Sequence, residues 1–244
     1  MNIVGIIPAR YASSRFPGKP LADIGGKSMI QRVYEQAVCA LPGKIVVATD
    51  DERIFHHVRQ FGGKVIMTRK EHRNGTERCA EACQLLGDSF DAVINIQGDE
   101  PFIEPDQIHL VASCLKDQQA PIATLVKKIH TTEEYLSPHV VKIVTDKNQK
   151  ALYFSRAPIP AVFPRSDHSS ILHNTFYKHI GIYGYRKEIL LQIVKLPPSP
   201  LEQAESLEQL RWLENGFAIY VRETTRETFA VDTPEDLQRL PERR

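Results

Sequence analysis

The first half of the chain alternates short apolar runs with longer amphipathic segments. The apolar runs predict strands at 3–7, 44–49, 64–68 and 91–96. The amphipathic segments predict helices at 29–40, 52–61, 77–86 and 105–115. Asp51 and Thr76 directly precede two helical runs, so we expect them to be N-caps. Strands that alternate with helices at this spacing predict an α/β fold with a doubly wound, mostly parallel sheet.

The second half of the chain has more strands. The pattern predicts strands at 122–128, 140–145, 151–154, 179–186 and 218–221. The turn sequence at 146–149 predicts that two of these strands form a hairpin. Residues 157–175 are rich in Pro, Ser and His without periodicity, which is typical of a mobile loop. An apolar stripe predicts one helix at 201–214, and a closing helix is expected at 234–240.

Composition adds limits on the class of protein. Of the 244 residues, 42% are hydrophobic and 25% are charged, and the formal net charge is +1. Near-neutral charge gives no reason to expect nucleic acid or an anionic membrane as a partner. No run approaches the ~20 apolar residues of a membrane span, and the N-terminal residues do not form a signal peptide. We expect one domain over 1–244, a cytoplasmic location, and no membrane insertion.

The four cysteines do not form a recognisable metal site. Cys79 and Cys83 are four positions apart on a predicted helix and could in principle bind a metal. No second pair and no suitably spaced histidine completes such a site. We therefore expect these two side chains to be buried thiols.

The segment 8–20 follows the first predicted strand and has the residues of a phosphate-binding loop. It contains three cations, hydroxyl groups and a glycine. Ligands of open α/β sheets bind beyond the carboxyl ends of the strands, and backbone N–H, Arg and Lys groups can wrap a triphosphate there. The segment matches neither of the common glycine-rich phosphate motifs. The alternative is a solvated basic loop.

Two further segments and one late aspartate extend this candidate site. The segment 72–78 leads into a predicted helix, whose N-terminus suits a phosphate or a polar nucleoside edge; the alternative is an ordinary capped turn. Asp99 lies at the end of the fourth predicted strand, where a carboxylate facing a phosphate loop is a natural Mg²⁺ ligand. Asp232 precedes a helix that Pro234 starts, so it either caps that helix or shares a metal ion with Asp99.

Seven motifs, in order along nearly the whole chain, resemble the 3-deoxy-manno-octulosonate (KDO) cytidylyltransferases, also called CMP-KDO synthetases. They are IPARYASSRFPGKPL from Ile7, HRNGTER from His72, NIQGDEP from Asn95, ALYFSRAPIP from Ala151, HIGIYGYR from His179, SPLEQAESLEQLR from Ser199 and VDTPEDL from Val231. The second-half motifs separate this family from the sialic-acid enzymes. One departure is Asn74, where the family often has Ser.

The resemblance implies a fold, a reaction and partners. The fold is Rossmann-like, of the nucleotide-diphospho-sugar transferase type, with a smaller β-rich insertion at about 120–200 for sugar binding and dimerisation. The reaction converts CTP and KDO into CMP-KDO and pyrophosphate for lipopolysaccharide biosynthesis, with Mg²⁺ as cofactor. It proceeds by in-line attack of the anomeric hydroxyl of the sugar on the α-phosphate of CTP. A homodimer is also implied.

The resemblance also assigns residues to roles. The nucleotide-binding residues would be Pro8, Ala9, Arg10, Ser13, Arg15, Lys19, Asn74, Gly75, Thr76 and Arg78. The sugar-binding residues would be Gln97, Arg156, His179, Tyr183, Glu208 and Gln209. Asp99 and Asp232 would hold Mg²⁺, and together with Arg10 and Lys19 they would form the catalytic set.

The chemistry of these residues suits that reaction. The sugar carboxylate and the triphosphate are both anions, so bringing them together costs several kcal/mol unless cations lie between them. Arg156 is expected to hold the sugar carboxylate by a two-point contact. Arg10, Lys19 and Mg²⁺ would offset the charge that builds on the phosphates. Either a metal-bound carboxylate or the metal itself could deprotonate the sugar hydroxyl.

Three alternatives stand beside this function. The chain could activate another acidic sugar such as sialic acid, or be a catalytically inactive binding protein on the same fold. The second alternative predicts a missing phosphate cation or metal ligand, whereas Lys19, Asp99 and Asp232 are all present. A nicotinamide dehydrogenase is disfavoured because no glycine fingerprint follows the first predicted strand.

Overall fold

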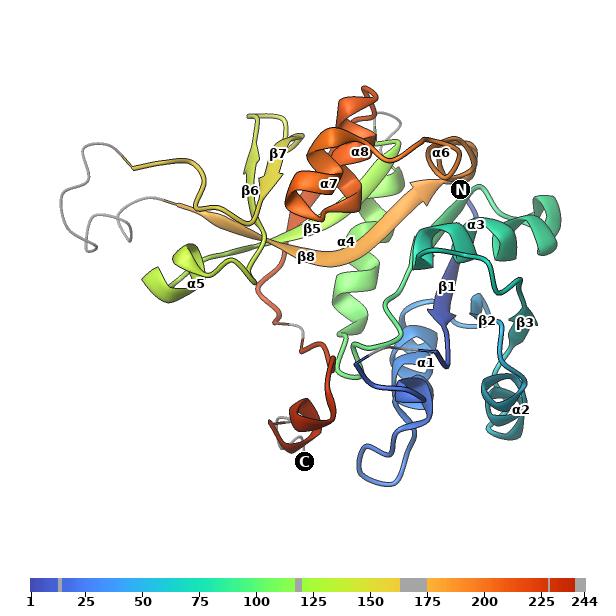
Figure 1. Cartoon of the computed structure of the whole chain (residues 1–244). Coiled ribbons are helices and arrows are strands. Elements are labelled where there is room, and N and C mark those ends of the chain that lie inside the picture. The colour runs from blue at the N-terminus through green and yellow to red at the C-terminus, as the bar shows by residue number, and fades with distance from the viewer. Residues whose placement is uncertain (13–14, 117–119, 163–174, 228, 240–244) are drawn as a thin grey trace.

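A mixed, mostly parallel sheet forms the centre of the protein in the computed structural model (Figure 1). The structure describes residues 1–12, 15–116, 120–162, 175–227 and 229–239. The main path of the sheet is β3-β2-β1-β4-β8-β5-β9, and the β6–β7 hairpin joins it at β8. The strands are β1 (Ile3–Ala9), β2 (Ile45–Thr49), β3 (Val65–Met67), β4 (Ala92–Asn95), β5 (Ile122–Lys128), β6 (Lys142–Thr145), β7 (Ala151–Ser155), β8 (Tyr177–Arg186) and β9 (Ile219–Glu223).

Strand directions divide the sheet into two parts. β1 is parallel to β2 and β4, β2 is parallel to β3, and β5 is parallel to β9. β8 lies antiparallel between β4 and β5 and so joins the two parallel groups. The predicted α/β fold with a mostly parallel sheet is confirmed.

Helices cover both faces of the sheet because successive strand residues point to opposite sides and both sets are apolar. In β1, Ile3 and Ile7 belong to one buried cluster, which includes residues of α1, α2 and α4. Val4 and Ile6 belong to the opposite cluster, which includes residues of α3, α6 and α8. The helices are α1 (Met29–Ala40), α2 (Glu52–Gln60), α3 (Gly75–Leu85), α4 (Pro105–Lys116), α5 (Thr132–Leu136), α6 (Lys187–Ile193), α7 (Pro200–Glu205) and α8 (Glu208–Glu214), with 3₁₀ turns η1 (Lys19–Leu21), η2 (Gly87–Ser89) and η4 (Pro234–Arg239). None of the helices in the described ranges is long and apolar enough to cross a membrane.

The predicted hairpin and buried thiols are confirmed. β6 and β7 pair antiparallel, with Lys142 opposite Ser155. The hairpin lies beside the N-terminal end of β8, near α5 (Figure 1). Cys79 and Cys83 are buried on α3. Most of the predicted mobile loop, residues 163–174, lies outside the described residues.

The single helix predicted at 201–214 is wrong. Ser206 adopts a left-handed conformation (φ 52°, ψ 48°), which ends α7 and separates it from α8. Leu201 is 38% exposed, whereas Leu207 is buried at the start of α8. The break separates the exposed Leu201 of α7 from Leu207 and Leu210, which are buried.

The N-cap of one predicted helix and the type of another also differ from the prediction. Thr76 is not the N-cap of α3: the side chain of Asn74 accepts a hydrogen bond from Glu77 N at 2.9 Å, and the helix begins at Gly75. Asp51 caps α2 as predicted, through a 2.9 Å bond from Arg53 N. The closing segment forms a 3₁₀ turn rather than an α-helix over its described residues.

Candidate active site

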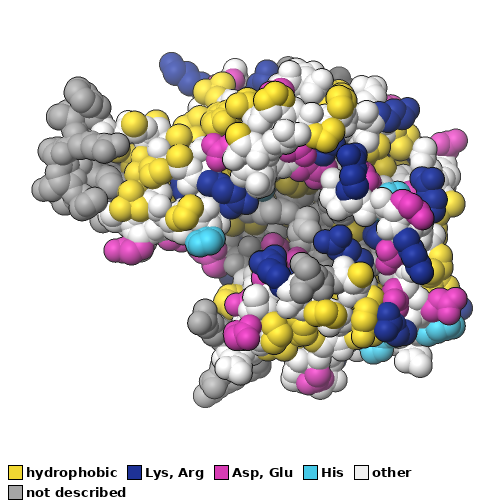
Figure 2. Space-filling view, in the orientation of Figure 1, with side chains coloured by type: hydrophobic (Ala, Val, Ile, Leu, Met, Phe, Trp, Pro, Cys, Tyr) yellow, Lys and Arg dark blue, Asp and Glu magenta, His cyan; other side chains and the backbone are white. Residues whose placement is uncertain are grey.

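A cavity of about 310 Å³ lies beyond the carboxyl ends of β1 and β4. Its wall comes from four separate segments: the loop after β1, the start of α3, the loop after β4, and one residue near the C-terminus. The lining residues are Pro8, Ala9, Arg10, Arg15, Lys19, Pro20, His72, Arg73, Asn74, Gly75, Arg78, Gln97, Gly98, Asp99 and Asp232. Figure 2 shows this face hollowed at its centre, with Lys and Arg side chains at the edge of the hollow.

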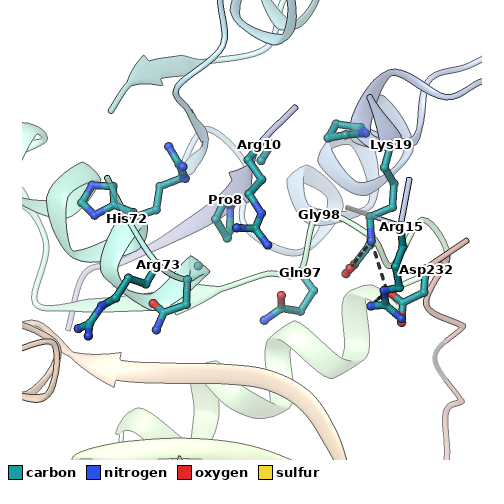
Figure 3. A pocket seen from close by; sticks show the side chains of 15 residues that line it. Pro8, Arg10, Arg15, Lys19, His72, Arg73, Gln97, Gly98 and Asp232 are labelled. Atoms are coloured by element: carbon teal, nitrogen blue, oxygen red, sulfur yellow. Dashed lines mark hydrogen bonds and ion pairs between the residues drawn. The ribbon is translucent and has the colours of Figure 1, made fainter. Parts of the chain in front are cut away.

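Two aspartates converge on one lysine at one side of the cavity. Lys19 Nζ lies 2.7 Å from Asp99 Oδ2 and 3.4 Å from Asp232 Oδ1 (Figure 3). Arg15 Nη2 lies 3.0 Å from the same Asp232 oxygen. Two carboxylates and two cations therefore form one charged cluster, while the exposed Arg10 extends into the cavity apart from it (Figure 3).

Backbone hydrogen bonds hold the segments that carry this cluster. Gly18, whose φ of 73° suits glycine, donates its N–H to Tyr11 O at 2.9 Å and so closes the loop just before Lys19. Val231 N donates to Asp99 O at 2.9 Å, which places Asp232 beside Asp99. A backbone hydrogen bond therefore places the two aspartates near each other.

Asp99 and Asp232 fit a Mg²⁺ site. Both are oxygen ligands, they already face one cation, and Mg²⁺ is usually held by one or two carboxylates together with substrate phosphates. Within the described part of the chain, no cluster of three or more His, Cys, Asp or Glu side chains could hold a metal ion without such phosphates.

The predicted nucleotide-binding residues divide into two groups. Pro8, Ala9, Arg10, Arg15, Lys19, Asn74, Gly75 and Arg78 line the cavity. Arg78 is 3% exposed, and its guanidinium pairs with Asp50 at 2.8 Å, so it supports the wall from within the protein. Thr76 is buried and does not line the cavity, and Ser13 lies outside the described residues.

Most predicted sugar-binding residues lie outside this cavity. Gln97 lines it, whereas Arg156, His179, Tyr183, Glu208 and Gln209 do not. The guanidinium of Arg156 donates to backbone oxygens, with Glu205 O at 2.8 Å.

The side chains of His179 and Tyr183 lie together on β8. Their ring centroids are 5.1 Å apart. His179 Nε2 lies 2.9 Å from Thr124 Oγ1, and burial lowers the pKa of His179 to about 3, so this imidazole is neutral at physiological pH. Burial also raises the pKa of the Tyr183 phenol, which keeps its proton.

Glu208 connects the two parts of the candidate site. Its Oε1 accepts from Asn74 Nδ2 at 2.9 Å, and its Oε2 accepts from Thr76 Oγ1 at 2.8 Å. Arg211 Nη2 donates to Oε1 at 3.0 Å. Burial raises the pKa of Glu208, although the Thr76 hydroxyl and the Arg211 charge act in the opposite direction.

Four lining residues were given no individual role from the sequence: Pro20, His72, Arg73 and Gly98. His72 and Arg73 belong to the HRNGTER motif, so the motif contained a signal for them. Both pair with acids of α3: His72 with Glu81, and Arg73 Nη2 with Glu77 at 2.6 Å. Gly98 belongs to the NIQGDEP motif, but the motif did not indicate how closely this residue approaches the backbone of Pro8.

Comparisons with known proteins identify the family of the chain. Residues 4–225 match the family model described as cytidylyltransferase. The chain is 53% identical to the 3-deoxy-manno-octulosonate cytidylyltransferase of Parabacteroides distasonis, over 98% of this chain and 96% of that protein. It is 48% identical to the one of Geobacter sulfurreducens, over 100% and 99% of the two chains.

A solved structure extends the likeness to three dimensions. It is the synthetase of CMP:2-keto-3-deoxy-manno-octonic acid complexed with CTP, with a TM-score of 0.89, 45% identity, and coverage of 98% of this chain and 96% of that one. The resemblance seen in the motifs is therefore confirmed. The chain belongs to the 3-deoxy-manno-octulosonate cytidylyltransferase family and is a nucleotidyltransferase.

Proposed function

We propose that this nucleotidyltransferase transfers the cytidylyl group of CTP to KDO, with pyrophosphate as the second product. The observation that carries the proposal is the cluster of Lys19, Arg15, Asp99 and Asp232 at the wall of a cavity beyond β1 and β4. Relatives that bear the name of this activity support it over nearly their full length. CMP-KDO then supplies lipopolysaccharide biosynthesis.

The bond changes define what the site must do. The anomeric oxygen of KDO forms a bond to the α-phosphorus and loses its proton, while the bond from that phosphorus to the bridging oxygen of the leaving pyrophosphate breaks. Negative charge grows on the transferring phosphate and the leaving group. Arg10, Arg15 and Lys19 line the cavity and stabilise this charge through charge-assisted hydrogen bonds.

Asp99 and Asp232 are proposed to hold Mg²⁺. Their carboxylates meet at Lys19 Nζ, at 2.7 and 3.4 Å, so the protein presents oxygens from both toward one cation. When bound, Mg²⁺ neutralises phosphate charge and helps to orient the reacting phosphate.

The remaining nucleotide-side residues form the walls of the site. Asn74 and Gly75 lie at the start of α3, where free backbone N–H groups and the helix dipole favour an anion or a polar nucleoside edge. Pro8 and Ala9 continue the wall from the end of β1. Arg78, paired with Asp50, holds α3 in place.

The sugar is proposed to bind between Gln97 and the β8–α8 side. Arg156 is the candidate for the sugar carboxylate, and its carbonyl partners at Glu205 and Pro138 fix the position of its side chain. His179, Tyr183 and Gln209 offer neutral polar groups that suit sugar hydroxyls.

We also propose that the chain forms a homodimer in the cytoplasm, where CTP is available. One domain over 1–244 would contain the β-rich insertion at about 120–200, which would serve sugar binding and dimerisation. Leu152 on β7 is 59% exposed and Leu136 at the end of α5 is 45% exposed, and these side chains suit a protein interface. Light scattering after gel filtration tests the dimer, and monomers of Leu152→Lys with normal melting would support this location.

Pyrophosphate release tests the proposed reaction. CTP, UTP, ATP and GTP are each supplied with Mg²⁺, with KDO, with sialic acid or with no sugar. We expect release only with CTP and KDO, and none after the metal is chelated. Release with sialic acid but not with KDO would replace the sugar assignment, and no release with any pair would favour the inactive binding protein.

A further inference from the structure

Glu208 lies where the nucleotide side of the site meets α8. It is the first residue of α8, and it contacts Asn74 and Thr76, which belong to a segment far away in the sequence. The family resemblance assigns Glu208 to the sugar. The contacts in the structure are instead with residues at the start of α3.

These contacts use both carboxylate oxygens. Asn74 Nδ2 and Arg211 Nη2 donate to Oε1 at 2.9 and 3.0 Å, and Thr76 Oγ1 donates to Oε2 at 2.8 Å. Arg211 is 3% exposed and also pairs with Glu202 at 3.1 Å, so the charge of Glu208 is balanced from inside α8. The carboxylate is therefore fixed on its own helix while it holds two donors of another segment.

The two residues that Glu208 contacts, Asn74 and Thr76, lie at the nucleotide side of the cavity. The side chain of Asn74 lines the cavity and accepts from Glu77 N at 2.9 Å, so it is both wall and N-cap of α3. Its amide has one oxygen for the cap and one nitrogen for Glu208, and the two bonds together fix the orientation of the side chain. Thr76 is buried and does not line the cavity, so it can affect a bound nucleotide only through its neighbours.

We propose that Glu208 is a positioning residue for CTP: through Asn74 and Thr76 it holds the start of α3 in the shape that binds the nucleotide. The proposal rests on the proposed cytidylyltransferase function and deepens it. It also couples the two substrates, because α8 carries Gln209 on the sugar side and is joined by Glu208 to the nucleotide side.

CTP binding in the absence of sugar tests this role. Isothermal titration with Mg²⁺ present compares the wild type with Glu208→Gln and Thr76→Val, neither of which changes a cavity-lining residue. Each variant should raise the Kd for CTP about tenfold, the factor that corresponds to about 1.4 kcal/mol. The double variant should be weaker than the wild type by less than the sum of the two single effects, because Thr76→Val removes one of the two contacts that Glu208→Gln disturbs.

Glu202→Gln is the matched control. Glu202 also pairs with Arg211 but has no hydrogen bond to Asn74 or Thr76 among the described contacts. It should leave the Kd for CTP within about twofold of the wild type, since its contacts do not reach the start of α3.

Three results would overturn the proposal. One is an unchanged Kd for CTP in Glu208→Gln together with a raised KM for KDO, which would make Glu208 a sugar contact. Another is an equal loss in Glu208→Gln and Glu202→Gln, which would indicate general loosening of α8. The third is full additivity of Glu208→Gln and Thr76→Val.

The test remains decisive if Glu208→Gln does not fold or if the wild type does not bind CTP. If Glu208→Gln does not fold, Thr76→Val alone decides, and unchanged CTP binding in that variant overturns the proposal. If the wild type itself does not bind CTP, the proposed function fails, and this is seen before any variant is compared.

Discussion

Adding one methyl group at Gly98 should disturb the metal side of the site. Gly98 lies between Gln97 and Asp99 and lines the cavity. A Cβ at this position would lie 2.9 Å from Pro8 O, a backbone oxygen of β1, while its other close contacts, with Ile7 and Ile30, are at 3.6 and 3.9 Å. A strand carbonyl cannot rotate away as a side chain can, so in Gly98→Ala the 97–100 loop must move.

The size of the movement follows from the contact. Ordinary van der Waals contacts of a Cβ begin near 3.4 Å, so the loop must withdraw from β1 by about 0.5 Å. Overpacking of this kind costs about 1–3 kcal/mol of stability. A misplacement of 1 Å in a catalytic site can cost a factor of about 100, so half of that distance should lower kcat/KM about tenfold.

Pyrophosphate release and thermal unfolding, measured on the same preparation, separate the two effects. Gly43→Ala is the control: its φ is 75°, and nothing lies within 4 Å of the added Cβ. It should lose about 1 kcal/mol from backbone strain and keep its activity, because Gly43 is remote from the cavity. A kcat/KM of Gly98→Ala within twofold of the wild type would refute the geometric reasoning.

Three other changes test single groups. Asp99→Asn should lower Mg²⁺-dependent pyrophosphate release by at least about 100-fold with little change in melting temperature, since a carboxylate ligand is lost; near-normal turnover would remove Asp99 from the metal site. Lys19→Ala should lower kcat/KM about 100-fold because the phosphates lose a cation; a change in thermal stability alone would contradict this. Finally, the folded protein keeps His179 neutral down to a pKa of about 3, whereas the unfolded chain takes up a proton near 6.5. The free energy of unfolding should therefore fall as the pH drops from 6.5 toward 3, by up to about 1.4 kcal/mol per pH unit more in the wild type than in His179→Gln. Urea unfolding of the two proteins at several pH values measures this difference. The same pH dependence of the unfolding free energy in both proteins would exclude this contribution.

Regular elements were predictable where local periodicity alone decides the structure. The helix predicted at 29–40 and the strand predicted at 122–128 agree with α1 and β5 at both ends. Their apolar positions repeat with the period of a helix in one case and form a continuous buried run in the other. In the folded protein, the elements that pack against α1 and β5 cover faces that are already apolar.

The break at Ser206 was not predictable in the same way. The leucines at 201–214 have helical spacing, and Ser is an ordinary residue within a helix. The left-handed Ser206 is maintained because it lets Leu207, Leu210 and Trp212 enter the buried cluster that also contains Tyr185 and Phe154. Packing against strands far away in the sequence outweighs local preference here.

The chain alone specifies the chemical groups of the site: the cations of the 8–20 segment, the acids at 99 and 232, and the motifs that indicate the family. Those properties belong to residue types and their order. Which of these groups come into contact follows from the folded arrangement. Lys19 contacts both Asp99 and Asp232, and Glu208 contacts Asn74 and Thr76. Side-chain contacts of a few ångströms depend on strand order and helix packing, because these bring distant segments together and have no local signature along the chain.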